Sequence, residues 1–288
     1  MFSSRYGEIV VSVGIVKSGL EIVGHRGCAG TQPENTLRGL SEALSMGVDG
    51  VEIDLRLTRD GVPVLLHDAH LNRTTNCESV EAFRGIKQLS VSELNLAQVV
   101  SLRTVDHLGS PTAETVPTLV QAAELIVETA AGWFIELKEP SPPGPWLHAL
   151  VHTIQSSMTF RCLLARGQIQ FLSFDHPALA AVGDLLRTHG YTVGLQPLVD
   201  TIPTGKELLQ ARLLGRTLGA DQRWLTLESV QSAQDAGMRI HPYTVNSYQD
   251  AERVRRLGIS AFTTDHPERF MHLRRAAEPA PGNSVPIR

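Results

Sequence analysis

The chain has 288 residues, a length that suits one α/β barrel of about 250 residues or two smaller domains. Hydrophobic residues make up 42% of the sequence, enough for a buried core, so global disorder is excluded. The formal net charge of −4 excludes a strongly basic nucleic-acid-binding protein and gives no reason to expect attraction to anionic membranes.

Cysteine usage and apolar segments indicate where the protein works. The three cysteines are far apart and form no CxxC pair, so the sequence predicts neither a disulfide framework nor a structural zinc site. The early apolar stretch, residues 9–16, is too short to cross a bilayer. We therefore expect a cytoplasmic protein with no integral membrane segment and no nucleic-acid partner.

Short apolar runs alternate along the chain with longer segments of helical spacing. The runs are apolar on both faces, as are strands of a parallel sheet that helices cover. Predicted strands are 21–24, 50–57, 133–137, 168–173, 192–195, 239–242 and 260–263, with a weaker eighth within 217–221. Predicted helices are 36–46, 119–131, 146–158, 177–188, 206–214, 227–236, 248–257 and 268–276. Eight such units predict a (β/α)8 TIM barrel, although periodicity alone leaves a doubly wound open sheet as the alternative.

A hairpin interrupts the alternation after the second strand. Asp60 and Gly61 stand between two apolar runs, a strong signal for a tight turn. A two-residue turn would place His67 opposite Asp54. A turn one residue longer would place His67 opposite Glu52 or nearby. In either register His67 lies close to the two carboxylates of the preceding strand.

The rest of the chain organises around one catalytic domain, predicted to span residues 21–277. A polar insertion without an obvious strand–helix unit occupies about 69–115, and insertions of that length are usually functional or partly folded. Residues 1–20 are predicted to be an N-terminal extension. Residues 278–288 carry three prolines and a glycine, which predicts a disordered tail.

Charged and titratable residues collect near the ends of three predicted strands. Residues two apart on a strand share a face, so the members of each acidic or mixed pair point together. Charges on the inner face of a barrel are costly unless they are paired or bind a metal, and barrel active sites lie at the C-terminal ends of the strands. The residues are His25 and Arg26 after the first strand, Glu52 and Asp54 in the second, and Glu136 and Lys138 at the next.

The charge of this cluster indicates a metal. Its three carboxylates and two cations carry a net negative charge, which would repel an anionic substrate. One divalent cation would reverse the sign and attract a phosphodiester. Oxygen ligands favour a hard ion, Mg²⁺ or Ca²⁺. His25 and His67 would then be free for proton transfer.

Short motifs follow one another in a specific order over roughly residues 21–270. They include His25-Arg26-Gly27, Pro33-Glu34-Asn35-Thr36, Val51-Glu52-Ile53-Asp54-Leu55, Thr58-Arg59-Asp60-Gly61, His67-Asp68, Arg73-Thr74-Thr75-Asn76, Ile135-Glu136-Leu137-Lys138, Thr244-Val245-Asn246 and Thr264-Asp265-His266-Pro267. In this order they resemble the glycerophosphodiester phosphodiesterase family. The sequence departs from the family at Tyr243, where tryptophan is usual, and around residues 219–224. Both places lie where the leaving alcohol or the glycerol rim is expected.

The resemblance implies a TIM barrel with a small subdomain inserted after the His67-Asp68 motif. It also implies a set of functional residues, which agrees with the roles assigned above from charge and strand position. These are the metal ligands Glu52, Asp54 and Glu136, the acid/base histidines His25 and His67, and the phosphate-binding residues Arg26 and Lys138.

The predicted function is metal-dependent hydrolysis of a small-molecule glycerophosphodiester to an alcohol and sn-glycerol 3-phosphate. Two alternatives stand beside it. A phospholipase D-type or lyase activity on lysophospholipids would need an apolar entrance. A non-catalytic barrel that binds phosphorylated ligands would be expected to lack one of the histidines or carboxylates, and all are present.

The nucleophile has two possible identities. One histidine could activate water, or it could deprotonate the glycerol 2-hydroxyl, which would attack its own phosphorus and give a cyclic phosphate. We favour the internal route, because the family resembles the phosphatidylinositol-specific phospholipases C, which have two histidines on a similar barrel and form a cyclic product. Oriented intramolecular attack can also reach effective molarities of about 10⁵–10⁸ M.

Overall fold

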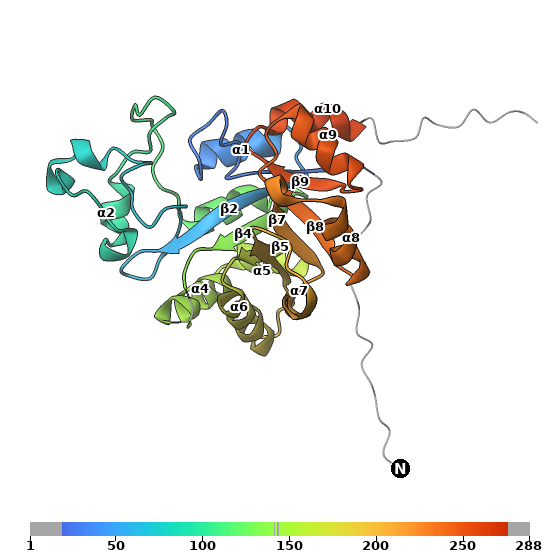
Figure 1. Cartoon of the computed structure of the whole chain (residues 1–288). Helices are drawn as coiled ribbons and strands as arrows, with labels where there is room; N and C mark the ends of the chain where they lie inside the picture. Colours follow the sequence, from blue (N-terminus) through green and yellow to red (C-terminus); the bar gives the residue numbers. More distant parts are fainter. Residues whose placement is uncertain (1–18, 141, 143, 276–288) are drawn as a thin grey trace, which may run out of the picture.

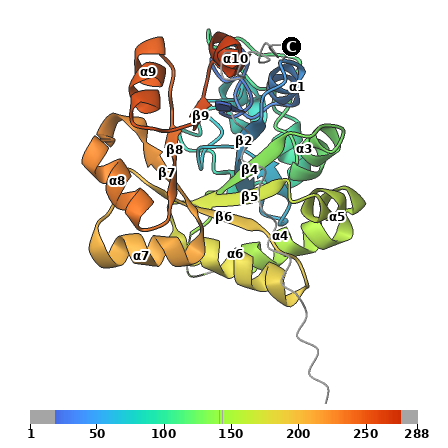
Figure 2. The same cartoon turned by 90° about the vertical axis from the view of Figure 1, so that its right-hand side faces the viewer.

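The computed structural model describes residues 19–140, 142 and 144–275. Most of the predicted N-terminal extension and all of the predicted tail, 278–288, lie outside the described residues. Parallel strands curve around a central axis with helices on their outer side (Figures 1 and 2). The strands are β1 Glu21–Gly24, β2 Gly50–Leu57, β3 Pro63–Leu65, β4 Gly132–Leu137, β5 Ile169–Ser173, β6 Gly194–Val199, β7 Thr217–Asp221, β8 Arg239–Tyr243 and β9 Ala261–Thr264.

Strand order confirms the predicted TIM barrel over the open-sheet alternative. The strands run β8-β7-β6-β5-β4-β2-β1-β9, all parallel, and β3 pairs antiparallel with β2 outside this path. Among the described residues no ladder pair joins β8 to β9. The two ends nevertheless meet, because His241 of β8 bonds through Nε2 to Thr263 Oγ1 of β9 at 2.9 Å. The barrel is therefore nearly closed.

The helices follow the strands as predicted, with differences at their ends. They are α1 Leu37–Ser45, α2 Leu96–Val100, α3 Leu119–Ile126, α4 Pro145–Ser156, α5 Met158–Ala165, α6 His176–Thr188, α7 Gly205–Leu214, α8 Leu227–Asp235, α9 Tyr248–Arg256 and α10 Pro267–Arg275. The single helix predicted over 146–158 is wrong in extent. Ser157 is extended and accepts a hydrogen bond from Phe160 N–H, so it ends α4 and caps α5.

The predicted bounds of one strand are wrong, and of the two turn lengths left open for the hairpin the longer one forms. β6 begins two residues later than predicted and continues to Val199, across Pro197, which interrupts the apolar run in the sequence. The hairpin is not a two-residue turn. Leu57 pairs with Pro63, and Thr58 N–H donates to Val62 O, so the loop contains three residues. Because of this register, Leu66 rather than His67 donates its N–H to Asp54 O.

The apolar core lies between the strands and the helices, while the barrel interior is rich in polar groups. Trp133 of β4 stacks on Phe160 of α5 with ring centroids 5.3 Å apart, and Phe262 of β9 meets Phe270 of α10 edge to face. All four rings are fully buried. Outward residues of the strands thus anchor the helices, and this arrangement leaves the inward positions available for functional side chains.

The segment after β3 builds its own small core beside the barrel, on the left in Figure 1. It holds α2 and the short 3₁₀ helices Cys77–Ser79, Glu81–Phe83 and Val91–Glu93. Leu71, Phe83 and Leu102 are among its buried side chains. Among the described residues, none of the helices combines the length and apolarity needed to cross a membrane.

Candidate active site

Three carboxylates meet where β2 and β4 end. Asp54 pairs in register with Glu136 on the neighbouring strand, and Glu52 lies one inward position below Asp54. One oxygen from each of the three lies within 4.8 Å of the others. Glu52 and Asp54 are almost fully buried, so their charges face each other with little solvent between them.

The two predicted cations contact the most buried of these carboxylates. Arg26 Nε lies 3.0 Å from Asp54 Oδ2, and Lys138 Nζ lies 3.1 Å from Asp54 Oδ1. Burial alone would raise the pKa of Asp54, but the charges of Lys138 and Arg26 outweigh it and hold that pKa far below its ordinary value. Lys138 also lies 2.5 Å from Glu136 Oε1. Asp54 is therefore ionised and central to the cluster.

Glu52 differs from Asp54 because no arginine or lysine side chain forms an ion pair with it among the described residues. Its Oε2 accepts a hydrogen bond from Arg26 N–H at 3.0 Å, and its Oε1 is buried without a hydrogen-bond partner. Burial and the neighbouring charge of Asp54 raise the pKa of Glu52 to about 8. Burial and Asp54 likewise raise the pKa of Glu136. Glu136 shares Lys138 with Asp54, so Glu52 is the carboxylate of the three without a paired arginine or lysine among the described residues.

His25 follows β1 and leans over this cluster. Its Nε2 lies 3.8 Å from Glu52 Oε2, and its Nδ1 lies 2.5 Å from Asp265 Oδ1. Asp265 is held in turn by Asn246, whose Nδ2 donates to Asp265 Oδ2. Burial lowers the pKa of His25, but the hydrogen bond to Asp265 and the charge of Glu52 more than offset it, so the pKa lies above its ordinary value.

His67 follows β3 and has a carboxylate of its own. Its Nδ1 lies 2.7 Å from Asp68 Oδ1, and Arg73 Nε donates to the other oxygen of Asp68. Arg73 also binds both oxygens of Glu34, which pairs with Arg26. Burial and the nearby cations lower the pKa of His67 despite the opposing effect of Asp54. The pKa values of the two histidines are therefore displaced in opposite directions.

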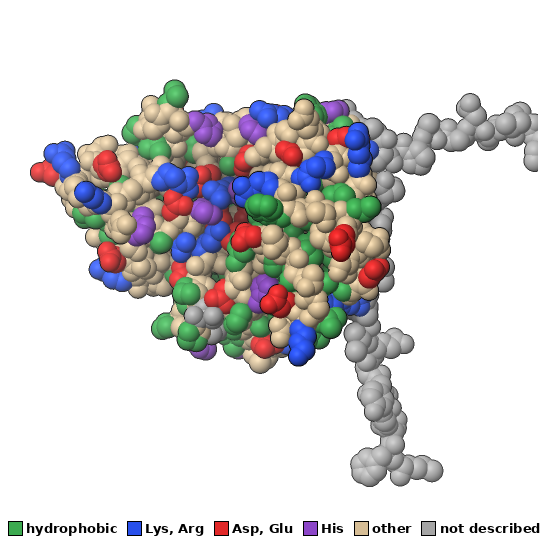
Figure 3. All heavy atoms as spheres, in the orientation of Figure 1, with side chains coloured by type: hydrophobic (Ala, Val, Ile, Leu, Met, Phe, Trp, Pro, Cys, Tyr) green, Lys and Arg blue, Asp and Glu red, His purple; other side chains and the backbone are tan. Residues whose placement is uncertain are grey.

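An open pocket joins these groups. His25, Arg26, His67, Glu136 and Lys138 line one part of it. Figure 3 shows charged and histidine side chains gathered around a hollow near the centre of this face. The structure thus brings all seven predicted site residues together, with Glu52 and Asp54 at the buried side of the same cluster.

The opposite wall of the pocket contains two aromatic side chains. Phe174, which follows β5, and Tyr243 of β8 meet edge to face with centroids 6.0 Å apart. Tyr243 OH donates to Val199 O, which fixes the ring. Beyond them, Arg223 forms a close ion pair with Asp221. An aromatic wall facing a charged cluster suits a molecule with a phosphate at one end and carbon groups at the other.

Sequence reasoning missed several residues that organise the site. Asn35 has a positive φ of 55°, and its side chain both donates to Asp54 Oδ2 and accepts from Asp54 N–H. Asp265 and Asn246 hold His25, and Asp68 holds His67. All lie within motifs quoted above, so the motif positions were a signal, but spacing along the chain did not reveal the partner of each.

Comparisons with known proteins agree with the family resemblance of the sequence motifs. The model of the "Glycerophosphoryl diester phosphodiesterase family" matches residues 25–269. An enzyme of Bacillus subtilis (strain 168) named glycerophosphodiester phosphodiesterase is 26% identical over 256 residues, covering 88% of this chain and 86% of its own. One of Bacillus altitudinis with the same name is 28% identical over 255 residues, covering 88% and 98%.

Solved structures agree with the fold. A phosphodiesterase of Oleispira antarctica, in complex with its product sn-glycerol-3-phosphate, is 26% identical with a TM-score of 0.70, covering 88% of this chain and 96% of its own. A glycerophosphoryl diester phosphodiesterase structure from Silicibacter pomeroyi gives a TM-score of 0.74 at 24% identity, covering 90% and 94%. Because the family model spans nearly the whole described chain, this protein belongs to the glycerophosphoryl diester phosphodiesterase family.

Proposed function

We propose that the chain uses one divalent cation and the histidine pair to hydrolyse glycerophosphodiesters to an alcohol and sn-glycerol 3-phosphate. Family membership makes it a glycerophosphodiester phosphodiesterase. The single observation that carries the rest is the convergence of three carboxylates and two histidines on one pocket. Each histidine is held through Nδ1 by a separate carboxylate.

The donor set fits a hard cation. Only carboxylate oxygens converge, and Glu52 Oε1 is buried without a hydrogen-bond partner, a costly arrangement unless another group occupies that position. Glu52, Asp54 and Glu136 would hold the ion, which is Mg²⁺ or Ca²⁺. When bound, such an ion supplies Lewis acidity, lowering the pKa of a nearby hydroxyl and offsetting negative charge that develops at the phosphate.

The protein's own residues would do the remaining work. Arg26 and Lys138 line the pocket and would contact the phosphate oxygens. With Nδ1 engaged by a carboxylate, each of His25 and His67 presents Nε2 to the reaction. One would take the proton of the attacking hydroxyl, and the other would give a proton to the departing alkoxide.

We favour the glycerol 2-hydroxyl as the attacking group. It would bond to phosphorus as the bond to the alcohol breaks, which leaves a cyclic phosphate. Water would then open the ring, with the histidine roles reversed, to give sn-glycerol 3-phosphate. The first step of this route needs no bound water, and the pocket holds both histidines within one space.

The pocket also bears on the lysophospholipid alternative. Phe174 is 46% exposed and, with Tyr243, forms an aromatic wall, but most of the other lining side chains are charged or polar. That balance favours a small hydrophilic alcohol. A long acyl chain would have to lie across Asp221 and Arg223.

Removal of the cation tests the proposal. Release of sn-glycerol 3-phosphate from a glycerophosphodiester should stop after chelation and return when Mg²⁺ or Ca²⁺ is restored. Glu52→Gln should end turnover or raise the metal concentration required, whereas Glu93→Gln, on the exposed surface of the insertion, should leave both unchanged. Full activity in a chelator-washed sample would contradict the metal role, and absence of any product under all conditions would favour the binding-only barrel.

A further inference from the structure

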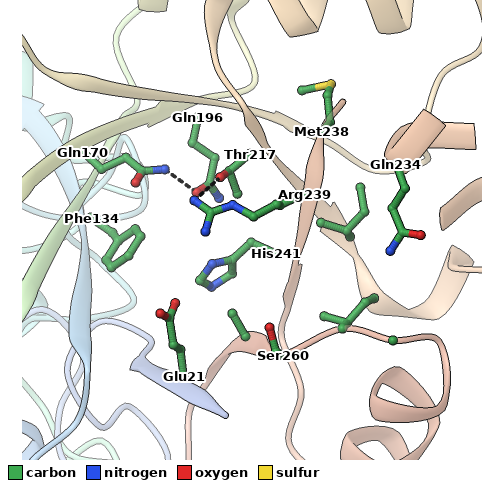
Figure 4. Close-up of a pocket in the computed structure, with 14 residues that line it drawn as sticks. Glu21, Phe134, Gln170, Gln196, Thr217, Gln234, Met238, Arg239, His241 and Ser260 are labelled. Carbon is green, nitrogen blue, oxygen red and sulfur yellow. Dashed lines mark hydrogen bonds between the residues drawn. The ribbon is translucent and has the colours of Figure 1, made fainter. Parts of the chain in front are cut away.

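A second pocket opens at the other end of the barrel. Its lining includes the first residue of four strands: Glu21 of β1, Thr217 of β7, Arg239 of β8 and Ala261 of β9. Parallel strands all begin at one end, so this pocket lies at the N-terminal end, away from the cluster at the C-terminal ends. Figure 4 shows its side chains around a central space.

Side chains that line the pocket pack over glycines at the starts of neighbouring strands. β2, β4 and β6 each begin with glycine, at Gly50, Gly132 and Gly194. A Cβ on Gly50 would lie 2.5 Å from the ring of Phe134, and one on Gly194 would lie 3.3 Å from the side chain of Gln170. Bulky branched side chains usually fill a TIM barrel. Here the lining is mixed, because polar side chains stand beside the apolar Phe134, Ile240 and Ile259.

Arg239 supplies an uncommitted cation to this space. Its guanidinium forms no ion pair among the described residues, and its one side-chain hydrogen bond is a long one, 3.4 Å from Nη2 to Thr217 Oγ1. In Figure 4 the guanidinium points inward toward Gln196. Arginine presents several donors in one plane and binds carboxylates and phosphates with two of them.

Gln196 adds a buried donor beside this cation. It is only 2% exposed, and its Oε1 accepts a hydrogen bond from Gln170 Nε2 at 2.6 Å. Its own Nε2 has no acceptor within hydrogen-bonding distance among the described residues. A guanidinium, an amide and the Thr217 hydroxyl therefore gather donors on one side of the pocket.

The other side of the pocket carries the opposite charge. Glu21 extends into it from β1 and forms no ion pair among the described residues. His241 stands between Glu21 and Arg239 in Figure 4, and burial lowers its pKa to about 4, so its ring adds no charge at neutral pH. A ligand that satisfies both walls has an anionic group at one end and a hydrogen-bond donor at the other.

We propose that this pocket binds a small anion that also carries a hydroxyl or ammonium group, with the anionic group on Arg239 and Gln196 and the donor group toward Glu21. The proposal is independent of the catalytic mechanism, since none of the seven candidate active-site residues lines the pocket. Polyol phosphates have the required chemistry, and sn-glycerol 3-phosphate is a convenient probe.

Equilibrium dialysis of the full chain with labelled sn-glycerol 3-phosphate tests the Arg239 end. The catalytic end also attracts phosphates, so binding is measured after chelation in an Arg26→Gln background. Arg239→Gln should then weaken the remaining binding by at least about tenfold, the loss expected for a charged hydrogen bond. Arg216→Gln is the matched control, because Arg216 is exposed one residue before β7 and does not line the pocket.

A second experiment tests the Glu21 end, where the substitution should strengthen the binding of phosphate instead of weakening it. Glu21→Gln should tighten binding of inorganic phosphate, because a repelling carboxylate is removed, and should reduce the preference for sn-glycerol 3-phosphate over phosphate. Thermal unfolding checks that each variant is folded. Unchanged binding in Arg239→Gln, or no binding at all in the Arg26→Gln background at millimolar probe, would overturn the proposal. An unchanged preference in Glu21→Gln would overturn the two-ended recognition.

Discussion

At the C-terminal end of the barrel the candidate cations are already paired with a carboxylate, whereas at the N-terminal end Arg239 forms no ion pair among the described residues. Arg26 and Lys138 both contact Asp54 within about 3 Å. Among the described residues, the one side-chain hydrogen bond of Arg239 is to Thr217. The difference teaches that a charged barrel interior can be used in two ways. Dense pairing fixes side chains for a reaction, while an unpaired charge in a hollow is available to a ligand.

Histidines show the same contrast. His25 and His67 each bond through Nδ1 to a carboxylate, while His241, deeper in the barrel, bonds to the hydroxyl of Thr263. Burial lowers the pKa of all three rings, but at His25 the hydrogen bond to Asp265 and the charge of Glu52 more than offset it. At His67 burial prevails in spite of Asp68, and at His241, which has no carboxylate partner among the described residues, burial lowers the pKa to about 4. The predictions below test this division, beginning with the largest expected effect on turnover.

Removal of the 2-hydroxyl from the substrate should abolish the reaction if the C-terminal end of the barrel is arranged for internal attack. The 2-deoxy analogue should bind comparably, because the phosphate and its contacts are unchanged, but its turnover should be negligible. Product release measured by phosphorus NMR checks this and would also reveal a cyclic phosphate from the natural diester. Hydrolysis of the analogue at a rate near that of the natural substrate would identify water as the nucleophile.

Removal of either carboxylate-bound histidine should have the next largest effect. His25→Ala and His67→Ala should each lower kcat by about 10²–10⁴-fold, the usual contribution of a general acid or base. Both variants should still bind metal, since neither side chain belongs to the carboxylate cluster. His148→Ala, on the exposed surface of α4, is the control. Near-normal kcat in both active-site variants would make these histidines structural.

Loss of the charge behind His25 should cost less. Asp265→Asn keeps a hydrogen-bonding group but removes the carboxylate, so kcat should fall by about 10- to 100-fold, as for loss of a charged hydrogen bond. Because Asp265 raises the pKa of His25, the limb of the pH–rate profile that reports His25 should also move to lower pH. A loss of rate without that movement would indicate a purely structural role for Asp265.

Sequence patterns anticipated the site where its geometry is local. The period of two along a strand places Glu52 and Asp54 on one face, and strand register then brings Glu136 beside Asp54. The pairing of His25 with Asp265 joins residues 240 positions apart, which no local pattern encodes. It follows from closure of the barrel, because β1 pairs with β9.

Other features escaped prediction for physical reasons. The hairpin loop has three residues because Thr58 exchanges hydrogen bonds with Val62 across it. An Asp-Gly pair in the sequence does not by itself fix the length of the loop. The N-terminal pocket is lined by residues from several strands, among them Glu21, Thr217 and Arg239. That is a property of facing strands taken together, and it is invisible in any one segment.

The last prediction concerns stability and should leave turnover least affected. Buried His241 is neutral in the folded chain down to about pH 4, whereas in the unfolded chain it takes up a proton near its ordinary pKa of 6.5. Below pH 6.5 the unfolded state therefore binds more protons, and the free energy of unfolding falls as pH falls through this window. A displacement of this size corresponds to about 3 kcal/mol at most. His241→Gln keeps a side chain able to bond to Thr263 but cannot titrate, so urea unfolding between pH 4 and 6.5 should show a flatter dependence than in the parent chain. His148→Gln, which changes an exposed histidine, should follow the parent curve. If His241→Gln also followed the parent curve, burial of His241 would not be the cause of the pH dependence of stability in this window.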